Sequence, residues 1–277
     1  MTDIRLNDPQ TLYRQWEHQQ WNPWQVDLAV DGEQWRNGVA GSDRELVLWA
    51  LSSLMVAEER ITTKFAGLVL AADSEEEASF LASQQVDEAR HMQFYARMQN
   101  EVIAEPETIA AHVDRSRERL GESFAVIFDE ALVSAHDRLV ADPDDAAAKV
   151  AFVTTYHLII ESTLGLTAFE FITRYLRDQG LLPGFVDGYS RIHHDEQRHI
   201  GYGVWLLREA AADGALADQI RTTLRDLLPA AAAALAPPDT EGTDWEALGA
   251  SSDEIREFAL GGLTRRLKIV GVPLDSI

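Results

Sequence analysis

The sequence contains no cysteine among its 277 residues, which excludes disulfides, thiolate nucleophiles and cysteine-ligated zinc or iron–sulfur sites. Any metal must therefore be held by oxygen and imidazole nitrogen. Basic residues are also few, because 24 Lys and Arg stand against 46 Asp and Glu, giving a formal charge of −22. This charge repels phosphate backbones and anionic membrane surfaces, so we expect no nucleic-acid partner.

Long uncharged apolar runs are absent as well. None approaches the roughly 20 residues that a membrane-spanning helix needs. The first residues, MTDIRLNDPQ, also lack the apolar segment of a signal peptide. We therefore expect a cytoplasmic protein without membrane insertion.

Apolar side chains recur at three- and four-residue intervals through most of the chain, whereas the two-residue alternation of strands is nearly absent. This periodicity predicts an all-α bundle of long helices with short connections. No linker or repeat divides the chain, so we expect one domain over residues 1–277. Its expected parts are an irregular lead-in at 1–41, a helical core at about 42–210 and C-terminal helices at about 214–269.

One four-residue pattern occurs twice. Glu88-Ala-Arg-His91 recurs as Glu196-Gln-Arg-His199, and an aspartate comes directly before each copy. Residues three apart share one face of a helix, so each copy presents a carboxylate and an imidazole together. A single Glu-x-x-His is a weak signal, but two copies on separate long helices indicate a metal site.

Two further helices each supply a carboxylate among apolar residues. Glu161 lies within YHLIIESTLGL, and Glu58 and Glu59 lie together within SLMVAEERITTKF. One member of that adjacent pair must point away, and Glu59 is predicted to be the ligand. A glutamate from each of two helices, with Glu-x-x-His from each of two others, is the ligand pattern of dinuclear metal-carboxylate bundles.

The predicted metal ligands are Glu59, Glu88, His91, Glu161, Glu196 and His199. Four carboxylates offset the charge of two divalent cations, and one imidazole completes the set at each ion. Asp195 can orient a ligating histidine by accepting its second N–H, whereas Asp87 is predicted to be a surface acid. His193 and His194 are predicted to lie outside the ligand set or at the surface.

The chain resembles the ribonucleotide reductase small-subunit superfamily of ferritin-like proteins in WNPWQVDLAVD, EERI, DEARH, YHLIIE and DEQRHIGYG. It is more similar to the ligand-binding oxidase branch of that superfamily than to ordinary reductase subunits, which usually have aspartate as the first ligand. Reductase subunits also end in a tail with a tyrosine that docks the large subunit, and the last residues here, GGLTRRLKIVGVPLDSI, contain none. The resemblance implies a ferritin-like bundle, two metal ions per chain with Mn/Fe favoured over Fe/Fe, a fatty-acid-like hydrophobic ligand and a homodimer.

The resemblance also implies roles for three further residues. The oxidase branch has a tyrosine–valine ether cross-link, with the tyrosine five residues before the third-helix glutamate and the valine two after the first-helix glutamate. These positions are Tyr156 and, counted from Glu59, Ile61, which retains a tertiary Cβ–H. Tyr95 lies four residues after His91, where reductase subunits have their radical tyrosine. It is either redox-active or a core tyrosine bonded to a nearby carboxylate.

The predicted function is that of a dinuclear metal oxidase, which activates O₂ for a two-electron oxidation. One alternative is a radical-generating reductase subunit, which Tyr95 favours. A second is a diiron arylamine N-oxygenase, whose family has an extra metal-binding histidine that His193 or His194 would provide. The third is a non-enzymatic metal-storage protein, against which the length of the chain argues.

Overall fold

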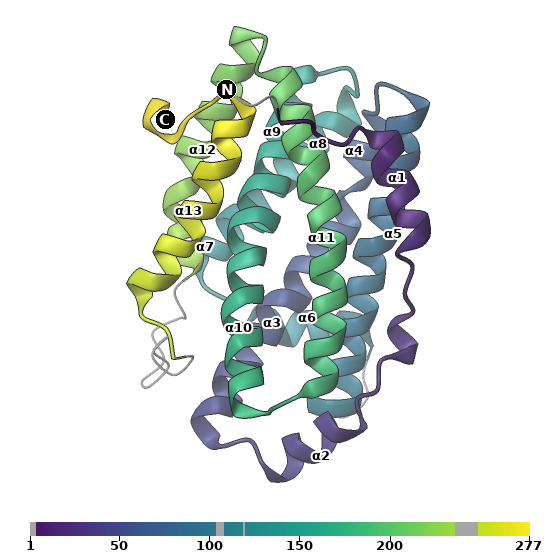
Figure 1. Ribbon diagram of the computed structural model, residues 1–277, viewed down its shortest axis with the longest axis vertical. Helices are drawn as coiled ribbons and strands as arrows, with labels where there is room; N and C mark the ends of the chain where they lie inside the picture. Colours follow the sequence, from purple (N-terminus) through teal and green to yellow (C-terminus); the bar gives the residue numbers. More distant parts are fainter. Residues whose placement is uncertain (1–3, 104–107, 119, 236–248) are drawn as a thin grey trace.

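The two Glu-x-x-His motifs lie on two long helices, α5 (Glu75–Arg97) and α11 (Pro183–Ala210) (Figure 1). The structure is a computed structural model, and it describes residues 4–103, 108–118, 120–235 and 249–277. The other α-helices are α1 (Pro9–His18), α2 (Ala29–Asn37), α3 (Gly41–Lys64), α4 (Ala66–Leu70), α6 (Ile109–Arg117), α7 (Glu122–Ala125), α8 (Leu132–Ala141), α9 (Ala146–Val153), α10 (Leu166–Gln179), α12 (Gly214–Ala234) and α13 (Ser252–Val270). The described residues also form three π-helical segments, η2 (Met98–Ile103), η3 (Val126–Ala131) and η4 (Thr154–Gly165), and two 3₁₀ turns, η1 (Pro23–Gln25) and η6 (Leu274–Ser276). No strand occurs within the described ranges, which confirms the predicted all-α class, and no described helix is long and apolar enough to cross a bilayer.

Four long helical segments form the frame of the bundle. They are α3, α5, α11 and a continuous helix that runs from α9 through η4 into α10 (Figure 1). α3 packs along α5, η4 packs along α11, and α12 and α13 cover η4 from outside. The continuous helix begins where the Asp145 carboxylate accepts a hydrogen bond from the Ala148 N–H at 2.9 Å, and it ends at Gly180, which has a φ of 63°. Glu161 lies in its π-helical part, a distortion that often marks a functional site.

The expected irregular lead-in at residues 1–41 is wrong, because this segment contains α1 and α2. α1 begins at a proline that follows Asp8, whose carboxylate accepts a hydrogen bond from the Thr11 N–H at 2.8 Å. In α2, buried Asp31 accepts hydrogen bonds from the backbone N–H groups of Gly184 and Phe185, at 2.8 and 2.6 Å. These bonds attach α2 to the start of α11, while α1 packs along α5. The segment therefore braces both motif-bearing helices.

A polar layer separates two clusters of buried apolar side chains. Along α3, Glu58 lies between Met55 of one cluster and Ile61 of the other. Along α5, the Glu-x-x-His motif lies between Leu81 and Phe94 in the same way. Apolar packing on both sides holds these helices in register. The polar side chains of the layer therefore have fixed positions although most of them are buried.

Gly188 and Gly201, both in α11, provide a matched test of this packing. A Cβ at Gly188 would lie 2.2 Å from the Phe94 ring, whereas a Cβ at Gly201 would meet only Leu12, at 3.8 Å. We expect Gly188→Ala to destabilise the protein by about 2–3 kcal/mol through overpacking. Gly201→Ala should be neutral or stabilising by up to about 1 kcal/mol, because alanine favours the helix. Urea unfolding checks both values, and equal midpoints for Gly188→Ala and the wild type would contradict the packing.

Candidate metal centre

Side chains from the four framing helices meet in two overlapping groups of potential metal ligands. The groups are Glu58, Glu88, His91 and Glu196, and Glu88, Glu161, Glu196 and His199. Within each group, one ligand atom from every residue lies within 4.8 Å of the others. Glu88 and Glu196 belong to both groups and are therefore placed to bridge two ions. The structure thus brings five of the six predicted ligands together, and Glu59 is the exception.

Each histidine turns its Nδ1 toward the carboxylates. His91 Nδ1 lies 3.3 Å from Glu88 Oε2 and 3.5 Å from Glu196 Oε1. His199 Nδ1 lies 3.0 Å from Glu161 Oε1 and 3.1 Å from Glu88 Oε1. Ligand atoms bonded at about 2.1 Å to one ion are about 3 Å apart. These spacings therefore match those around a shared cation.

Glu58 takes the place in the group that was predicted for Glu59, and this corrects the choice between the two residues. The Glu58 side chain is 8% exposed, and its Oε2 lies 3.7 Å from His91 Nδ1. The Glu59 side chain is 22% exposed and accepts a hydrogen bond from Arg117 Nη2 at 3.2 Å. Consecutive residues of an α-helix point about 100° apart. Only Glu58 therefore faces the other carboxylates.

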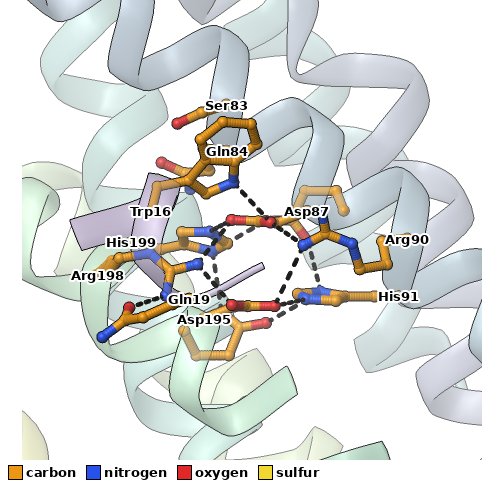
Figure 2. Close-up of polar contacts among 12 residues, drawn as sticks. Trp16, Gln19, Ser83, Gln84, Asp87, Arg90, His91, Asp195, Arg198 and His199 are labelled. Atoms are coloured by element: carbon orange, nitrogen blue, oxygen red, sulfur yellow. Dashed lines mark hydrogen bonds and ion pairs between the residues drawn. The ribbon is translucent and has the colours of Figure 1, made fainter. Parts of the chain in front are cut away.

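Each histidine is held by the aspartate that precedes the opposite motif (Figure 2). His91 Nε2 lies 3.1 Å from Asp195 Oδ2, and His199 Nε2 lies 3.3 Å from Asp87 Oδ2. Such a bond at Nε2 leaves Nδ1 free for a metal ion. Asp195 was predicted to orient a ligating histidine, and the structure places it beside His91 Nε2 as that role requires. The prediction that Asp87 is a surface acid is wrong, because the residue is fully buried.

Two indoles and two guanidiniums support these aspartates, and Arg90 Nη1 lies 2.6 Å from Asp87 Oδ1. Trp21 Nε1 donates to Asp195 Oδ2 at 2.7 Å, and Trp16 Nε1 donates to Asp87 Oδ1 at 2.9 Å. Arg198 Nη2 lies between the two carboxylates, 2.9 Å from Asp87 Oδ2 and 2.5 Å from Asp195 Oδ1 (Figure 2). The positive charge offsets the burial of both aspartates. Sequence reasoning missed Trp16, Trp21 and Arg198, although the arginine lies within the second motif.

Burial and mutual contact raise the pKa values of Glu58, His91, Glu161 and His199, whereas the nearby His199 and His91 rings hold the pKa of Glu88 well below its usual range despite its burial. Burial raises the pKa of Glu58 to about 8 and raises the pKa of Glu161 well above its ordinary value. Burial alone would lower the pKa of His91, but the nearby Glu58 and Asp195 carboxylates raise it well above its ordinary value. Glu161 and Glu88 act in the same way on His199. Without cations, the cluster therefore retains protons to balance its buried charge.

The donor set fits two cations. Glu58 Oε2, His91 Nδ1, Glu161 Oε2 and Glu196 Oε2 are buried and have no hydrogen-bond partner among the described residues. Buried polar atoms are normally paired, so four open ligand atoms in one place indicate a missing partner. All four are atoms that divalent first-row metals accept. Bound cations would therefore give the four unpaired ligand atoms a partner and would balance the negative charge of the carboxylates.

Metal binding should therefore release protons. At pH 7 we expect more than one proton to leave each chain when Mn(II) binds, because carboxylate and imidazole ligands must be deprotonated. Affinity should fall as the pH falls, since protons then compete better with the ion. Calorimetric titration in buffers of different ionisation enthalpy counts the protons. Mn(II) binding without proton release would contradict the described charge state.

Gln84 links Tyr156 to the carboxylates and was missed by the sequence analysis. The Tyr156 hydroxyl donates a hydrogen bond to Glu88 Oε1. Gln84 Nε2 donates to the Tyr156 hydroxyl at 3.2 Å and lies 3.5 Å from Glu161 Oε1. All four residues are buried. The position of Gln84, one helical turn before Glu88, was a usable signal.

Ile61 shares a helix face with Glu58. It lies three residues after Glu58 and four before Phe65, whose ring packs edge-on against Tyr156 with centroids 5.3 Å apart. The residue two after Glu58 is Arg60, whose guanidinium pairs instead with Asp129. The sequence analysis assigned Ile61 by counting two residues on from Glu59, which is not the glutamate that faces the carboxylate group. Ile61 nevertheless faces the same side as the carboxylate group.

An apolar cavity of about 420 Å³ opens beside the carboxylate group. Glu58, Glu161 and Glu196 form part of its wall, and Ile61 and Tyr95 also line it. Its other walls are mainly aliphatic and aromatic side chains from α3, α7, α10, α11, α12 and η4. A cavity of this size and polarity is typical of small-molecule sites.

His193, His194 and Tyr95 lie outside the two ligand groups. His193 lines the cavity and stacks on Phe169, with ring centroids 3.8 Å apart, and His194 is exposed. Neither histidine belongs to a candidate ligand group of the described residues. The Tyr95 hydroxyl is buried and has no partner among the described residues. The carboxylate-bonded core tyrosine considered from sequence is therefore not observed.

Comparison with known protein families identifies the family to which the chain belongs. The model of the ribonucleotide reductase small-chain family matches residues 1–236. This match covers most of the sequence, including both Glu-x-x-His motifs. The chain belongs to the ribonucleotide reductase small-chain family.

Solved structures with the same fold include variants of an R2-like ligand-binding oxidase with an aerobically reconstituted Mn/Fe cofactor. Two of them have a TM-score of 0.83 at 22% and 23% identity, covering 95% of this chain and 97% and 94% of theirs. A form with an anaerobically reconstituted Mn/Fe cofactor has a TM-score of 0.81 at 22% identity, covering 96% of this chain and 94% of that one. At such identities the likeness shows the ferritin-like fold that the resemblance implied.

Proposed function

We propose that this protein is a dinuclear metal oxidase that activates O₂ for a two-electron oxidation. The observation that carries the proposal is the set of buried, unpartnered carboxylate and imidazole atoms beside an apolar cavity. A metal centre and a site for an organic molecule would then share one wall. Membership of the reductase small-chain family supports an oxidoreductase.

The proposed ligands of the two ions are Glu58, Glu88, His91, Glu161, Glu196 and His199. Carboxylate and imidazole ligands suit both manganese and iron. The preference for Mn/Fe over Fe/Fe rests on the Mn/Fe cofactors of the structurally similar oxidases. When bound, the ions supply electrons for the reduction of O₂. Asp87 and Asp195 hold the histidine rings so that Nδ1 faces the ions.

The proposed organic partner is a hydrophobic small molecule of fatty-acid-like dimensions. The cavity supports this proposal through its volume and its mainly apolar wall. The structurally similar proteins are described as ligand-binding oxidases. We further propose that the chain acts in the cytoplasm as a homodimer and as one domain.

We also propose an ether cross-link between Tyr156 Oη and Ile61 Cβ. Its formation breaks the Tyr156 O–H and Ile61 Cβ–H bonds, and the two hydrogen atoms that leave, which are two protons and two electrons, reduce O₂ as the oxidant. The support is the common face of Glu58, Ile61 and Phe65 on α3, together with the packing of Phe65 on Tyr156. We expect aerobic loading with Mn(II) and Fe(II) to join the two peptides with a loss of two hydrogens. Peptide mass spectrometry checks this, and Tyr156→Phe should abolish the product.

Separate, unmodified peptides that contain Tyr156 and Ile61 after aerobic loading would refute the cross-link. The metal centre would not be affected by that result, because neither residue is a proposed ligand. Anaerobic loading is the matched control and should give no cross-link.

A radical-generating subunit of ribonucleotide reductase is the second candidate. Family membership and Tyr95, which lies near the carboxylate group, favour it. Two observations would establish it. One is reconstitution of ribonucleotide reduction with a large subunit, and the other is a tyrosyl radical that disappears in Tyr95→Phe. We expect neither.

Oxygen uptake tests the proposed oxidase directly. Protein loaded anaerobically with Fe(II) should consume O₂ in proportion to its bound metal when mixed with aerated buffer. Glu161→Ala should consume less O₂, in line with its lower metal content, whereas Glu59→Ala should behave like the wild type. A wild-type protein that binds metal and consumes no O₂ would contradict the oxidase. Uptake of many more than two ions per chain would instead indicate metal storage.

A further inference from the structure

We propose that Tyr202 is a redox-active residue, which gives one electron to the oxidised metal centre and its phenolic proton to Glu77. A one-electron reductant in solution then replaces the electron through Trp205. The inference rests on the proposed oxidase, because O₂ at the metal centre is the oxidant. It gives the oxidase a source of electrons other than its organic substrate.

A chain of aromatic rings leads from the carboxylate group toward the surface. The Tyr156 ring, whose hydroxyl donates to Glu88, meets the His157 ring edge-on with centroids 4.5 Å apart. The His157 and Tyr202 centroids are 5.4 Å apart, and those of Tyr202 and Trp205 are 6.0 Å apart. The first three rings are fully buried, whereas Trp205 is partly exposed. Electrons tunnel readily between rings this close, so the chain connects the buried centre with the surface.

The end of the chain near the metal centre is held in a fixed position. Gln84 Nε2 lies 3.2 Å from the Tyr156 hydroxyl and 3.2 Å from His157 Nε2. Gly203 leaves room for the histidine, because a Cβ there would lie 2.3 Å from His157 Cβ. The close packing keeps the Tyr156, His157 and Tyr202 rings in contact.

Tyr202 has a base beside its hydroxyl. A phenol that loses an electron becomes a strong acid, so its oxidation is easiest where a nearby group accepts the proton. The Tyr202 hydroxyl donates a hydrogen bond to Glu77, a buried carboxylate. The hydroxyls of Tyr95 and Tyr189 are also buried but have no partner among the described residues. Of these three tyrosines, Tyr202 is therefore the one prepared for oxidation.

Lys149 and Asp73 balance the charges before and after the step. Lys149 Nζ lies 2.9 Å from Glu77 Oε1 and 2.7 Å from Oδ2 of Asp73, whose side chain is exposed. When the electron leaves Tyr202, the O–H bond breaks and the proton binds to Glu77. A neutral tyrosyl radical and a neutral carboxylic acid remain, and Asp73 continues to pair with Lys149. No buried charge is therefore left without a partner.

Electron paramagnetic resonance in a Tyr156→Phe background tests the proposal. Reduction of O₂ to water takes four electrons, of which two come from the ions and two from the proposed cross-link. Tyr156→Phe keeps the ring and prevents the cross-link, so other residues must supply electrons. We expect a transient tyrosyl radical when this variant, loaded anaerobically with Mn(II) and Fe(II), is mixed with O₂ and frozen. Adding Tyr202→Phe should remove most of the signal.

Tyr175→Phe is the matched control in the same background. The Tyr175 hydroxyl also bonds to a carboxylate, that of Asp43, but its ring is not part of the chain. The radical signal should therefore be unchanged. A radical that survives Tyr202→Phe would overturn the proposal, and so would a radical that is removed by Tyr95→Phe instead.

Lys149→Met/Glu77→Gln tests the proton acceptor in that background. The double change leaves no buried charge and keeps an oxygen for the Tyr202 hydrogen bond, but an amide does not take up the proton. The radical should be lost as in Tyr202→Phe, while cooperative urea unfolding shows that the variant is folded. An undiminished radical in the folded variant would show that Glu77 does not accept the proton.

Trp205 is tested with ascorbate, a one-electron reductant. Ascorbate should shorten the lifetime of the Tyr202 radical, and Trp205→Phe should weaken this effect, because phenylalanine is much harder to oxidise than tryptophan. Equal acceleration by ascorbate with and without Trp205 would show that electrons enter elsewhere.

Metal-free protein separates this inference from the proposed oxidase. Photogenerated tris(bipyridine)ruthenium(III) can oxidise Trp205 from outside, and electron transfer from Tyr202 should then give a tyrosyl signal that is smaller in Tyr202→Phe. This result would support the electron route even if the loaded protein consumed no O₂, which would defeat the oxidase alone. Oxygen uptake by the loaded Tyr156→Phe protein without a Tyr202 radical would defeat the electron route alone.

Discussion

Replacement of Glu161 by alanine is expected to lower the metal content from about two ions per chain to about one or fewer. The Glu161 carboxylate lies 3.0 Å from His199 Nδ1 and belongs to one of the two ligand groups. Its removal takes a negative charge and a ligand from one ion while leaving the other group intact. His199→Ala should have a similar effect, because it removes the only imidazole of that group. Metal analysis after loading and desalting gives the stoichiometry.

Glu58 and Glu59 offer a matched control for this experiment. Glu58→Ala should lose metal as Glu161→Ala does, whereas Glu59→Ala should retain about two ions per chain. The two substitutions are chemically identical and one residue apart. Both variants therefore lose the same negative charge from α3, and only a specific role in metal binding should distinguish them. Full metal content in Glu58→Ala with loss in Glu59→Ala would show that the described orientation of α3 is wrong. About two metal ions per chain in both Glu161→Ala and His199→Ala would show that these residues do not form a metal centre.

Lys149→Met is expected to destabilise the protein by about 3–5 kcal/mol. Lys149 and Glu77 are 6% and 3% exposed, and Lys149 Nζ lies 2.9 Å from Glu77 Oε1. The Tyr202 hydroxyl and the Asp73 N–H also donate hydrogen bonds to Glu77. Without the lysine, a carboxylate remains buried with no cation beside it. Urea unfolding of the metal-free protein measures the change in free energy.

Two further variants show whether the stranded charge causes this effect. Lys149→Met/Glu77→Gln should recover a large part of the loss, because the double change leaves no buried charge. Arg138→Met breaks the exposed Arg138–Asp145 pair and should change stability by less than about 1 kcal/mol. A Lys149→Met effect as small as that of Arg138→Met would contradict the account of a buried ion pair.

The positions that sequence predicted best are those with a fixed spacing on one helix. Each Glu-x-x-His motif determines its own geometry, since residues three apart share a face wherever the helix packs. Glu161 was also predictable, because apolar residues surround it in the sequence. The choice between Glu58 and Glu59 was not, because it depends on the rotation of α3 against α5. Arg117, which faces Glu59, comes from α6 and is distant in sequence.

Other features depend on contacts between distant segments and escaped prediction for that reason. Asp87 precedes Glu88 in a motif that looks solvent-facing, but Arg198 and His199 from α11 bury it. The first 41 residues contain prolines, glycines and tryptophans, which suggested irregular structure. Their helices depend on an N-terminal cap at Asp8 and on bonds from Asp31 to α11. The π-helical turn around Glu161 likewise has no reliable sequence signal.

The most direct test of the central claim is anomalous diffraction at the manganese and iron edges from crystals of aerobically loaded protein. The account predicts two metal ions per chain within the polar layer. One should be bound by Glu58 and His91 and the other by Glu161 and His199, with Glu88 and Glu196 shared between them. A single ion, ions elsewhere in the chain, or coordination by Glu59 in place of Glu58 would contradict it.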